Sequence, residues 1–204
     1  MNIDYQLYLV TDEQTSEEEL LPIVEKAVLG GVTAVQLREK HSEGKIFFEK
    51  AIKLKQLLAK FDVPLIINDR VDIALAVNAE GIHIGQKDLP LVEVKKIIPN
   101  SMIVGVSVQT EEQALVAQKE GADYIGVGTV FPTTTKPDAI TMSFATLRKI
   151  VQAIHIPAVA IGGISLENVH QLSNVGVSGI SVVSAIMKAD DPKSAAQMLR
   201  NSFK

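Results

Sequence analysis

The sequence predicts one (β/α)₈ barrel, and three observations on the 204-residue chain indicate this fold. Short apolar runs recur roughly every 20–30 residues, the spacing that a strand, a helix and two turns require. The runs are nearly continuous in Val, Ile, Ala and Leu, as is typical of parallel strands buried on both faces. Glycines or polar residues follow each run, and barrels of this class build their sites from loops at the carboxyl ends of strands. Eight even units favour closure over an open doubly wound sheet, with residues 1–204 as a single domain.

Apolar periodicity and end signals predict the elements of the first half. LYLVT (7–11) is expected to be the first strand, and 16–29 its amphipathic helix. Ser16 and Glu19 form a capping-box pattern at the start of that helix, and the glycines at 30–31 end it. The other strands expected in this half are 33–38, 64–69 and 81–85, and the other helices are 44–60, 70–78 and 89–98.

The second half repeats the alternation. The tripeptides GGV, EGA and VGV, which precede several strands along the chain, mark helix ends. The strands expected here are 102–108, 124–130, 157–163 and 179–186, and the helices are 111–120, 143–153, 165–174 and 191–203.

Composition excludes several classes of protein. No apolar run approaches the ~18–20 residues of a membrane span, and MNIDYQLYLVTDEQ lacks the basic region and cleavage site of a signal peptide, so a cytoplasmic enzyme is expected. The absence of cysteine excludes disulfides, thiolate metal sites and cysteine nucleophiles. A net charge of −4 with dispersed Lys and Arg, and no Trp, argues against a nucleic-acid partner.

The first polar cluster is QLREK, at 36–40. On a strand, Gln36, Arg38 and Lys40 would share one face, while Leu37 and Glu39 would share the other. An arginine and a lysine inside a barrel need an anion to compensate their charge. The alternative is a surface edge, where either cation pairs with an ordinary glutamate.

Two acidic residues follow neighbouring strands. Asn68 and Asp69 end the run IIND, and Asp88 follows GIHIG. Carboxylates from adjacent strand ends can hold Mg²⁺, which takes few protein ligands when substrate phosphates supply the others. Either aspartate could instead cap the helix after it. His83 lies between two isoleucines and is expected to be a buried, hydrogen-bonded side chain in preference to a catalytic base.

The segment GTVFPTTTK (128–136) is the most unusual in the chain. Its hydroxyls, amides and the Lys136 ammonium suit a phosphate or pyrophosphate, although a polar surface loop has the same composition. AIGGI (160–164) and VVSAI (182–186) end the last two strands, whose loops frequently form a phosphate site in this fold. Close packing of helix on strand is the alternative for those glycines.

Taken in order, QLREK, ND, GIHIGQKD, GVS, FPT-x-TK, GGI and SAI resemble the thiamine-phosphate synthase (thiamine-phosphate pyrophosphorylase) family. The resemblance runs over nearly the whole chain, from LYLVTDE to VVSAI. It implies a TIM barrel and a transferase that joins a hydroxymethylpyrimidine diphosphate to a hydroxyethylthiazole phosphate, giving thiamine phosphate and pyrophosphate. The implied cofactor is Mg²⁺, and the implied partners are these small phosphorylated substrates, with neither nucleic acid nor membrane.

The resemblance also implies a role for each matching residue. Asp69 and Asp88 would bind Mg²⁺. Residues in contact with the pyrimidine diphosphate would be Gln36, Leu37, Arg38, Glu39, Lys40, Asn68, Ser107 and Lys136. Residues in contact with the thiazole phosphate would be Thr133, Thr134, Thr135, Gly163, Val183 and Ser184. The catalytic residues would be Arg38, Lys40, Ser107 and Lys136.

One position departs from many relatives, which have His where this chain has Gln109 in GVSVQT. Glutamine cannot act as a general acid or base. The related thiazole tautomerases rely on that histidine and usually lack the intact REK and TK pattern, so both differences point away from them. A Schiff-base aldolase that uses a lysine and a non-catalytic binding or regulatory protein are two further possibilities. The sequence does not fix the oligomeric state, and a homodimer is one option.

Overall fold

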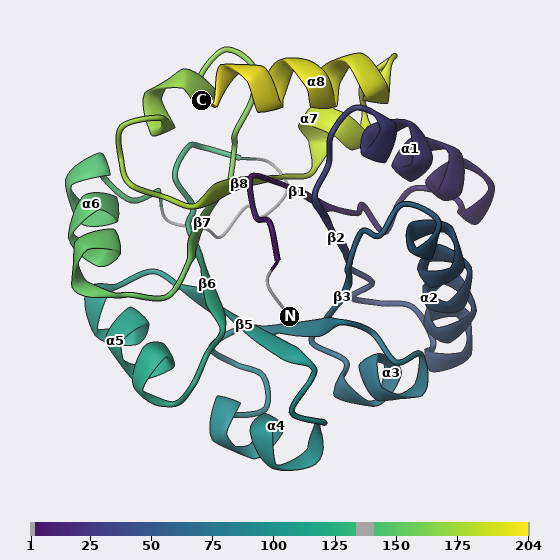
Figure 1. Ribbon diagram of the computed structural model, residues 1–204, viewed down its shortest axis with the longest axis horizontal. Coiled ribbons are helices and arrows are strands. Elements are labelled where there is room, and N and C mark those ends of the chain that lie inside the picture. Colours follow the sequence, from purple (N-terminus) through teal and green to yellow (C-terminus); the bar gives the residue numbers. More distant parts are fainter. Residues whose placement is uncertain (1–2, 134–140, 204) are drawn as a thin grey trace.

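The protein is described by a computed structural model that covers residues 3–133 and 141–203. Eight parallel strands close into a barrel in chain order, with β8 paired to β1 (Figure 1). The strands are β1 (Leu7–Val10), β2 (Ala34–Leu37), β3 (Leu65–Asn68), β4 (Gly81–Ile84), β5 (Ile103–Val108), β6 (Tyr124–Val127), β7 (Ala158–Ile161) and β8 (Gly179–Val182). The predicted (β/α)₈ barrel is confirmed.

The helices form a ring outside the strands (Figure 1). They are α1 (Glu17–Leu29), α2 (Gly44–Ala59), α3 (Val71–Ala76), α4 (Leu91–Ile97), α5 (Glu111–Lys119), α6 (Phe144–Ala153), α7 (Ser184–Met187) and α8 (Pro192–Ser202), with the 3₁₀ helix η1 (Val169–Leu172). Among the helices of the described ranges, none combines the length and the apolar character needed to cross a bilayer.

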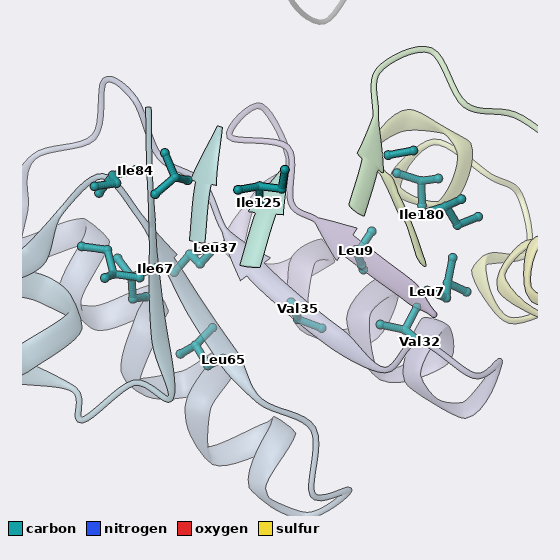
Figure 2. Close-up of a cluster of buried hydrophobic side chains, with 14 of the residues drawn as sticks. Leu7, Leu9, Val32, Val35, Leu37, Leu65, Ile67, Ile84, Ile125 and Ile180 are labelled. Carbon is teal, nitrogen blue, oxygen red and sulfur yellow. The ribbon is translucent and has the colours of Figure 1, made fainter. Parts of the chain in front are cut away.

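Side chains alternate between two buried layers along each strand. Leu9, Val35 and Ile67 point outward into the layer between strands and helices (Figure 2). The residues between them in sequence point inward, where Tyr8, Ile66 and others form a separate buried cluster inside the barrel. Both faces of the strands are therefore covered and most of their residues are apolar, which is why the strands appear as nearly continuous apolar runs in the sequence.

Local signals place the helix starts. The predicted capping box is present, because the Ser16 hydroxyl accepts from the Glu19 amide and the Glu19 carboxylate accepts from the Ser16 amide. The side chains of Thr110, Ser143 and Asp191 also accept from first-turn amides, at the starts of α5, α6 and α8. Each cap satisfies amides that the first helical turn leaves without partners.

The strands predicted at 124–130 and 157–163 end early, at Val127 and Ile161, and two further elements differ more from the structure. Only η1 is helical within 165–174, because the Asn168 side chain accepts from the Ser165 amide and donates to the Gly163 carbonyl, which favours an irregular turn over a regular helix. The predicted last strand, 179–186, ends at Val182, and α7 follows at once.

The chain before β1 closes the amino end of the barrel. Ile3 and Tyr5 belong to the interior cluster, and the Tyr5 ring centroid lies 4.7 Å from that of Tyr124. In Figure 1 this segment crosses the middle of the ring of strands. Gly179 permits the crossing, since a Cβ there would lie 1.7 Å from the Tyr5 carbonyl oxygen. The carboxyl end, where the predicted site residues lie, is the end left for a substrate.

Candidate active site

The REK segment follows β2 and is held by its main chain. The amide of Arg38 donates to the Thr11 hydroxyl at 3.1 Å, and the amide of Lys40 donates to the Glu13 carboxylate at 2.6 Å. The Lys40 ammonium forms an ion pair with Asp69, at the end of β3. The ends of β2 and β3 thus meet, and the partner of Lys40 is an aspartate of the predicted metal pair and not a surface glutamate.

Leu37 and Glu39 point the other way, as the predicted alternation requires. The Glu39 carboxylate is buried and accepts from Lys50 of α2 at 2.8 Å and from the Ser42 hydroxyl. Leu37 belongs to the apolar layer outside the barrel. A contact of either residue with the pyrimidine diphosphate stays a prediction, and it would involve the main chain because both side chains are engaged elsewhere.

The two aspartates lie side by side. Burial, together with a hydrogen bond and repulsion from the neighbouring Asp88 carboxylate, raises the pKa of Asp69, although the Lys40 ammonium opposes the rise. Asp69 adopts φ 60°, a left-handed conformation that aspartate tolerates better than most residues. Its amide donates to the His83 carbonyl at 2.8 Å, which ties the end of β3 to β4.

Neither aspartate caps a helix. The cap residues of α3 and α4 are Arg70 and Pro90, and neither makes a side-chain cap bond. Asp88 accepts from the Gly85 amide at 2.7 Å and so closes a turn before α4. The capping alternative for these residues is therefore wrong.

The carboxylate pair fits a hard divalent cation. Two adjacent acids at a half-buried position leave negative charge that a cation would compensate. The described ranges contain no group of three or more His, Cys, Asp or Glu side chains arranged around a common metal position. A pair of carboxylates suits Mg²⁺, which takes one or two from protein and the rest from waters and phosphates.

Polar side chains form the floor beneath these strand ends. The Nδ2 atom of Asn68 is buried and has no hydrogen-bond partner among the described residues, so it is available to a bound group. His83 is 8% exposed and lies 2.9 Å from both the Tyr124 hydroxyl and the Ser107 hydroxyl. It is the buried, hydrogen-bonded histidine that the sequence predicts. Tyr124, which sequence reasoning did not select, belongs to this floor.

The opposite side of the mouth joins the segment after β6 to that after β7. The Phe131 amide donates to the Gly162 carbonyl at 3.0 Å, and a Cβ at Gly163 would lie 2.3 Å from the Pro132 carbonyl oxygen. Both glycines have positive φ, at 106° and 63°. They let the segment at Phe131 and Pro132, just before Thr133, pack closely on the chain after β7.

Other residues of the predicted thiazole phosphate site follow β8. Val183 is the residue before α7, and Ser184 is its first residue. Of the remaining predicted residues, Thr134, Thr135 and Lys136 lie outside the described ranges. Contacts with substrate stay predictions for the whole set.

Comparison with known proteins adds a family to this geometry. A model described as thiamine monophosphate synthase matches residues 7–186. A thiamine-phosphate synthase of Ruminiclostridium cellulolyticum is 55% identical over 202 residues, covering 98% of this chain and 96% of that protein. A thiamine-phosphate synthase of Methanobrevibacter smithii is 50% identical over 203 residues, covering 100% of this chain and 97% of that protein. The solved structure of a thiamine phosphate pyrophosphorylase from Pyrococcus furiosus matches with a TM-score of 0.91 at 42% identity. The match covers 98% of this chain and 96% of that one.

These matches extend across the barrel and include every described strand end discussed above. The relatives also align along nearly their full lengths. The chain belongs to the thiamine monophosphate synthase family.

Proposed function

We infer that this chain is a thiamine-phosphate synthase. It joins the methylene carbon of a hydroxymethylpyrimidine diphosphate to the nitrogen of a hydroxyethylthiazole phosphate and releases pyrophosphate. The observation that carries this inference is the meeting of Lys40, Asp69 and Asp88 at the ends of three successive strands, in a chain of this family.

Charge on the departing diphosphate is what the protein must stabilise. The aminopyrimidine can support a cationic methylene, so the carbon–oxygen bond breaks in a largely dissociative displacement as the thiazole nitrogen attacks. Arg38 and Lys40 follow β2 at the mouth of the barrel and are proposed to bind the diphosphate oxygens, where preorganised cations are most effective. Lys136 is proposed for the same role. No protein nucleophile takes part.

Asp69 and Asp88 are proposed to hold Mg²⁺ beside the diphosphate. Bound Mg²⁺ would supply positive charge to the leaving group. The Asp88 carboxylate is oriented by the Gly85 amide, and Asp69 is oriented by its left-handed backbone and by Lys40. The Nδ2 of Asn68, which has no hydrogen-bond partner in the described part of the chain, is proposed to donate to the pyrimidine diphosphate from the floor of the site.

Gly163, Val183 and Ser184 are proposed to hold the thiazole phosphate, together with Thr133, Thr134 and Thr135. Gly163 follows β7, and Val183 and Ser184 follow β8. Binding both substrates in one mouth converts a bimolecular encounter into a reaction between oriented neighbours.

The proposal includes small phosphorylated partners, with neither nucleic acid nor membrane, a cytoplasmic location and a homodimer as assembly. The net charge of −4 supports the exclusion of nucleic acid. Light scattering on the purified protein would test the homodimer.

The decisive experiment mixes the purified protein with both substrates and Mg²⁺ and measures thiamine phosphate and pyrophosphate. Thiamine phosphate and pyrophosphate are expected in equal amounts, and neither should form when EDTA is present. Lys40→Met should lower turnover at least ~100-fold, because the variant removes one preorganised cation from the diphosphate. Lys45→Met, which changes an exposed lysine of α2, is the matched control and should leave turnover unchanged. Absence of product from the parent protein would refute the proposed function.

A further inference from the structure

Five side chains cross the barrel interior in one continuous hydrogen-bonded chain, which we call the interior relay. The Gln36 amide of β2 donates to the Tyr8 hydroxyl of β1 at 2.9 Å, and the hydroxyls of Tyr8 and Tyr124 lie 2.9 Å apart. The Tyr124 hydroxyl lies 2.9 Å from Nδ1 of His83, whose Nε2 lies 2.9 Å from the Ser107 hydroxyl. Gln36 and Ser107 are predicted substrate contacts, and the mechanism above uses none of the three residues between them.

The barrel is shaped to hold this relay. A Cβ at Gly105 of β5 would lie 2.1 Å from Cζ of Tyr124, and one at Gly126 of β6 would lie 3.1 Å from Cε1 of His83. Both strands therefore lack side chains where the two rings lie. Tyr8 and Tyr124 are 2% and 0% exposed, so water does not compete for their hydroxyls.

The Gln36 amide nitrogen is the fixed donor of the relay, and assigning the other links from it gives the relay a direction. Burial raises the pKa of both tyrosines, so each hydroxyl keeps its proton at neutral pH. Tyr8 accepts from the Gln36 amide nitrogen. In the assignment that gives each tyrosine hydroxyl one accepted and one donated bond, Tyr8 donates to Tyr124, and Tyr124 donates to Nδ1 of His83. A neutral imidazole then carries its proton on Nε2 and donates to Ser107. This direction leaves the Ser107 proton and the Gln36 carbonyl oxygen for other partners.

We propose that Tyr8, Tyr124 and His83 are positioning residues that make Gln36 an acceptor and Ser107 a donor toward the pyrimidine, and so select its 4-amino form. The proposal rests on the proposed function and adds the basis of selectivity. A 4-aminopyrimidine offers an amino donor beside a ring-nitrogen acceptor, whereas its 4-oxo counterpart offers a ring N–H donor beside a carbonyl acceptor. The relay matches the first pattern. Matching the second would require turning the Gln36 amide and reversing every link together.

The first test needs no substrate. Nitrogen NMR of ¹⁵N-histidine-labelled protein, with His83→Gln to assign the signal, should show a neutral His83 with its proton on Nε2. Tyr124→Phe removes the donor to Nδ1 and should shift that nitrogen signal. A proton on Nδ1 in the parent protein would reverse the relay and refute the assigned roles of Gln36 and Ser107.

The second test measures selectivity in Tyr8→Phe and Tyr124→Phe. The readout is the Kd of the 4-oxo pyrimidine diphosphate divided by the Kd of the 4-amino compound. Each variant should lower this ratio about tenfold, because each loses one buried hydrogen bond. KM for the thiazole phosphate should stay within about twofold of the parent value. Tyr5→Phe is the matched control, since the Tyr5 hydroxyl makes no hydrogen bond to the described residues and its ring packs on Tyr124.

The outcomes separate this proposal from the function on which it rests. A parent protein that makes thiamine phosphate, with an unchanged ratio in both folded variants, would refute the relay alone. An equal fall in Tyr5→Phe would assign the effect to packing and also refute it. A parent protein without product would refute the function, while the NMR experiment still decides the direction of the relay.

Discussion

Asp69 combines backbone and side-chain features that only a few residue types could provide. Its φ of 60° suits Asp, Asn or Gly, and its carboxylate lies beside Asp88 and Lys40. Non-glycine residues in this region cost stability and concentrate at functional positions. Sequence reasoning placed Asp69 at the strand end but left its capping role open. The backbone geometry decides between a site residue and a helix cap, because a cap residue requires an extended conformation and Asp69 is left-handed.

Asp69→Asn separates charge from backbone strain. Asparagine tolerates the same φ, so the variant should fold, while turnover at saturating Mg²⁺ should fall at least ~100-fold because the proposed metal site has one carboxylate fewer. The raised pKa means that the ionised Asp69 carboxylate is unfavourable in the folded state. This loss of stability is fully present above the folded-state pKa and absent below the unfolded-state pKa. The free energy of unfolding of Asp69→Asn in metal-free buffer at neutral pH should therefore equal or exceed that of the parent. Asp72→Asn, at an exposed carboxylate of α3, is the control, and equal turnover in both variants would contradict the assignment.

At the scale of elements, the end of β2 shows how one strand serves two layers. The predicted alternation gave Glu39 the face opposite Lys40, and the structure confirms that assignment. The partner Lys50, from the middle of α2, was not predicted, because the periodicity of an amphipathic helix marks its buried face without indicating which polar group the face meets. The ion pair anchors the segment after β2 on α2, behind Lys40.

Lys50→Met tests this anchor. It leaves the Glu39 carboxylate buried without its cation, which should lower the free energy of unfolding by about 3–5 kcal/mol in urea titrations. The double variant Glu39→Met/Lys50→Met should recover most of that stability. Its KM for the pyrimidine diphosphate should still exceed that of the parent, because the REK segment no longer has its anchor. Lys53→Met, on the same helix, breaks an exposed ion pair with Glu17 of α1 and should change little. A double variant with the parent KM would show that the pair serves stability alone.

Across the whole molecule, the sequence predicts the eight-unit repeat and the end of the barrel that carries the site. Spacing and continuous apolar strands determine both features, and the pairing of β8 with β1 confirms closure. The interior contacts that link distant strands could not be predicted, since Tyr8 and Tyr124 are 116 residues apart and look like ordinary strand residues. The closure of the amino end by Tyr5 was missed for the same reason: its only sequence signal is the glycine at 179, which stands on another strand.

Gly179→Ala tests whether that closure holds the barrel together. The added Cβ would lie 1.7 Å from the Tyr5 carbonyl oxygen and 2.4 Å from its carbon, and backbone atoms cannot move aside as a flexible side chain can. The N-terminal segment should therefore be displaced. The free energy of unfolding should fall by about 1–3 kcal/mol, and Tm should fall by several degrees. Gly44→Ala is the matched control, because its Cβ would meet only the end of the Arg70 side chain at 3.3 Å, in the first turn of α2. Its Tm should stay the same or rise, since alanine favours helix more than glycine. Equal Tm values for the two variants would mean that the segment before β1 adjusts freely and that the strands alone maintain the closed barrel.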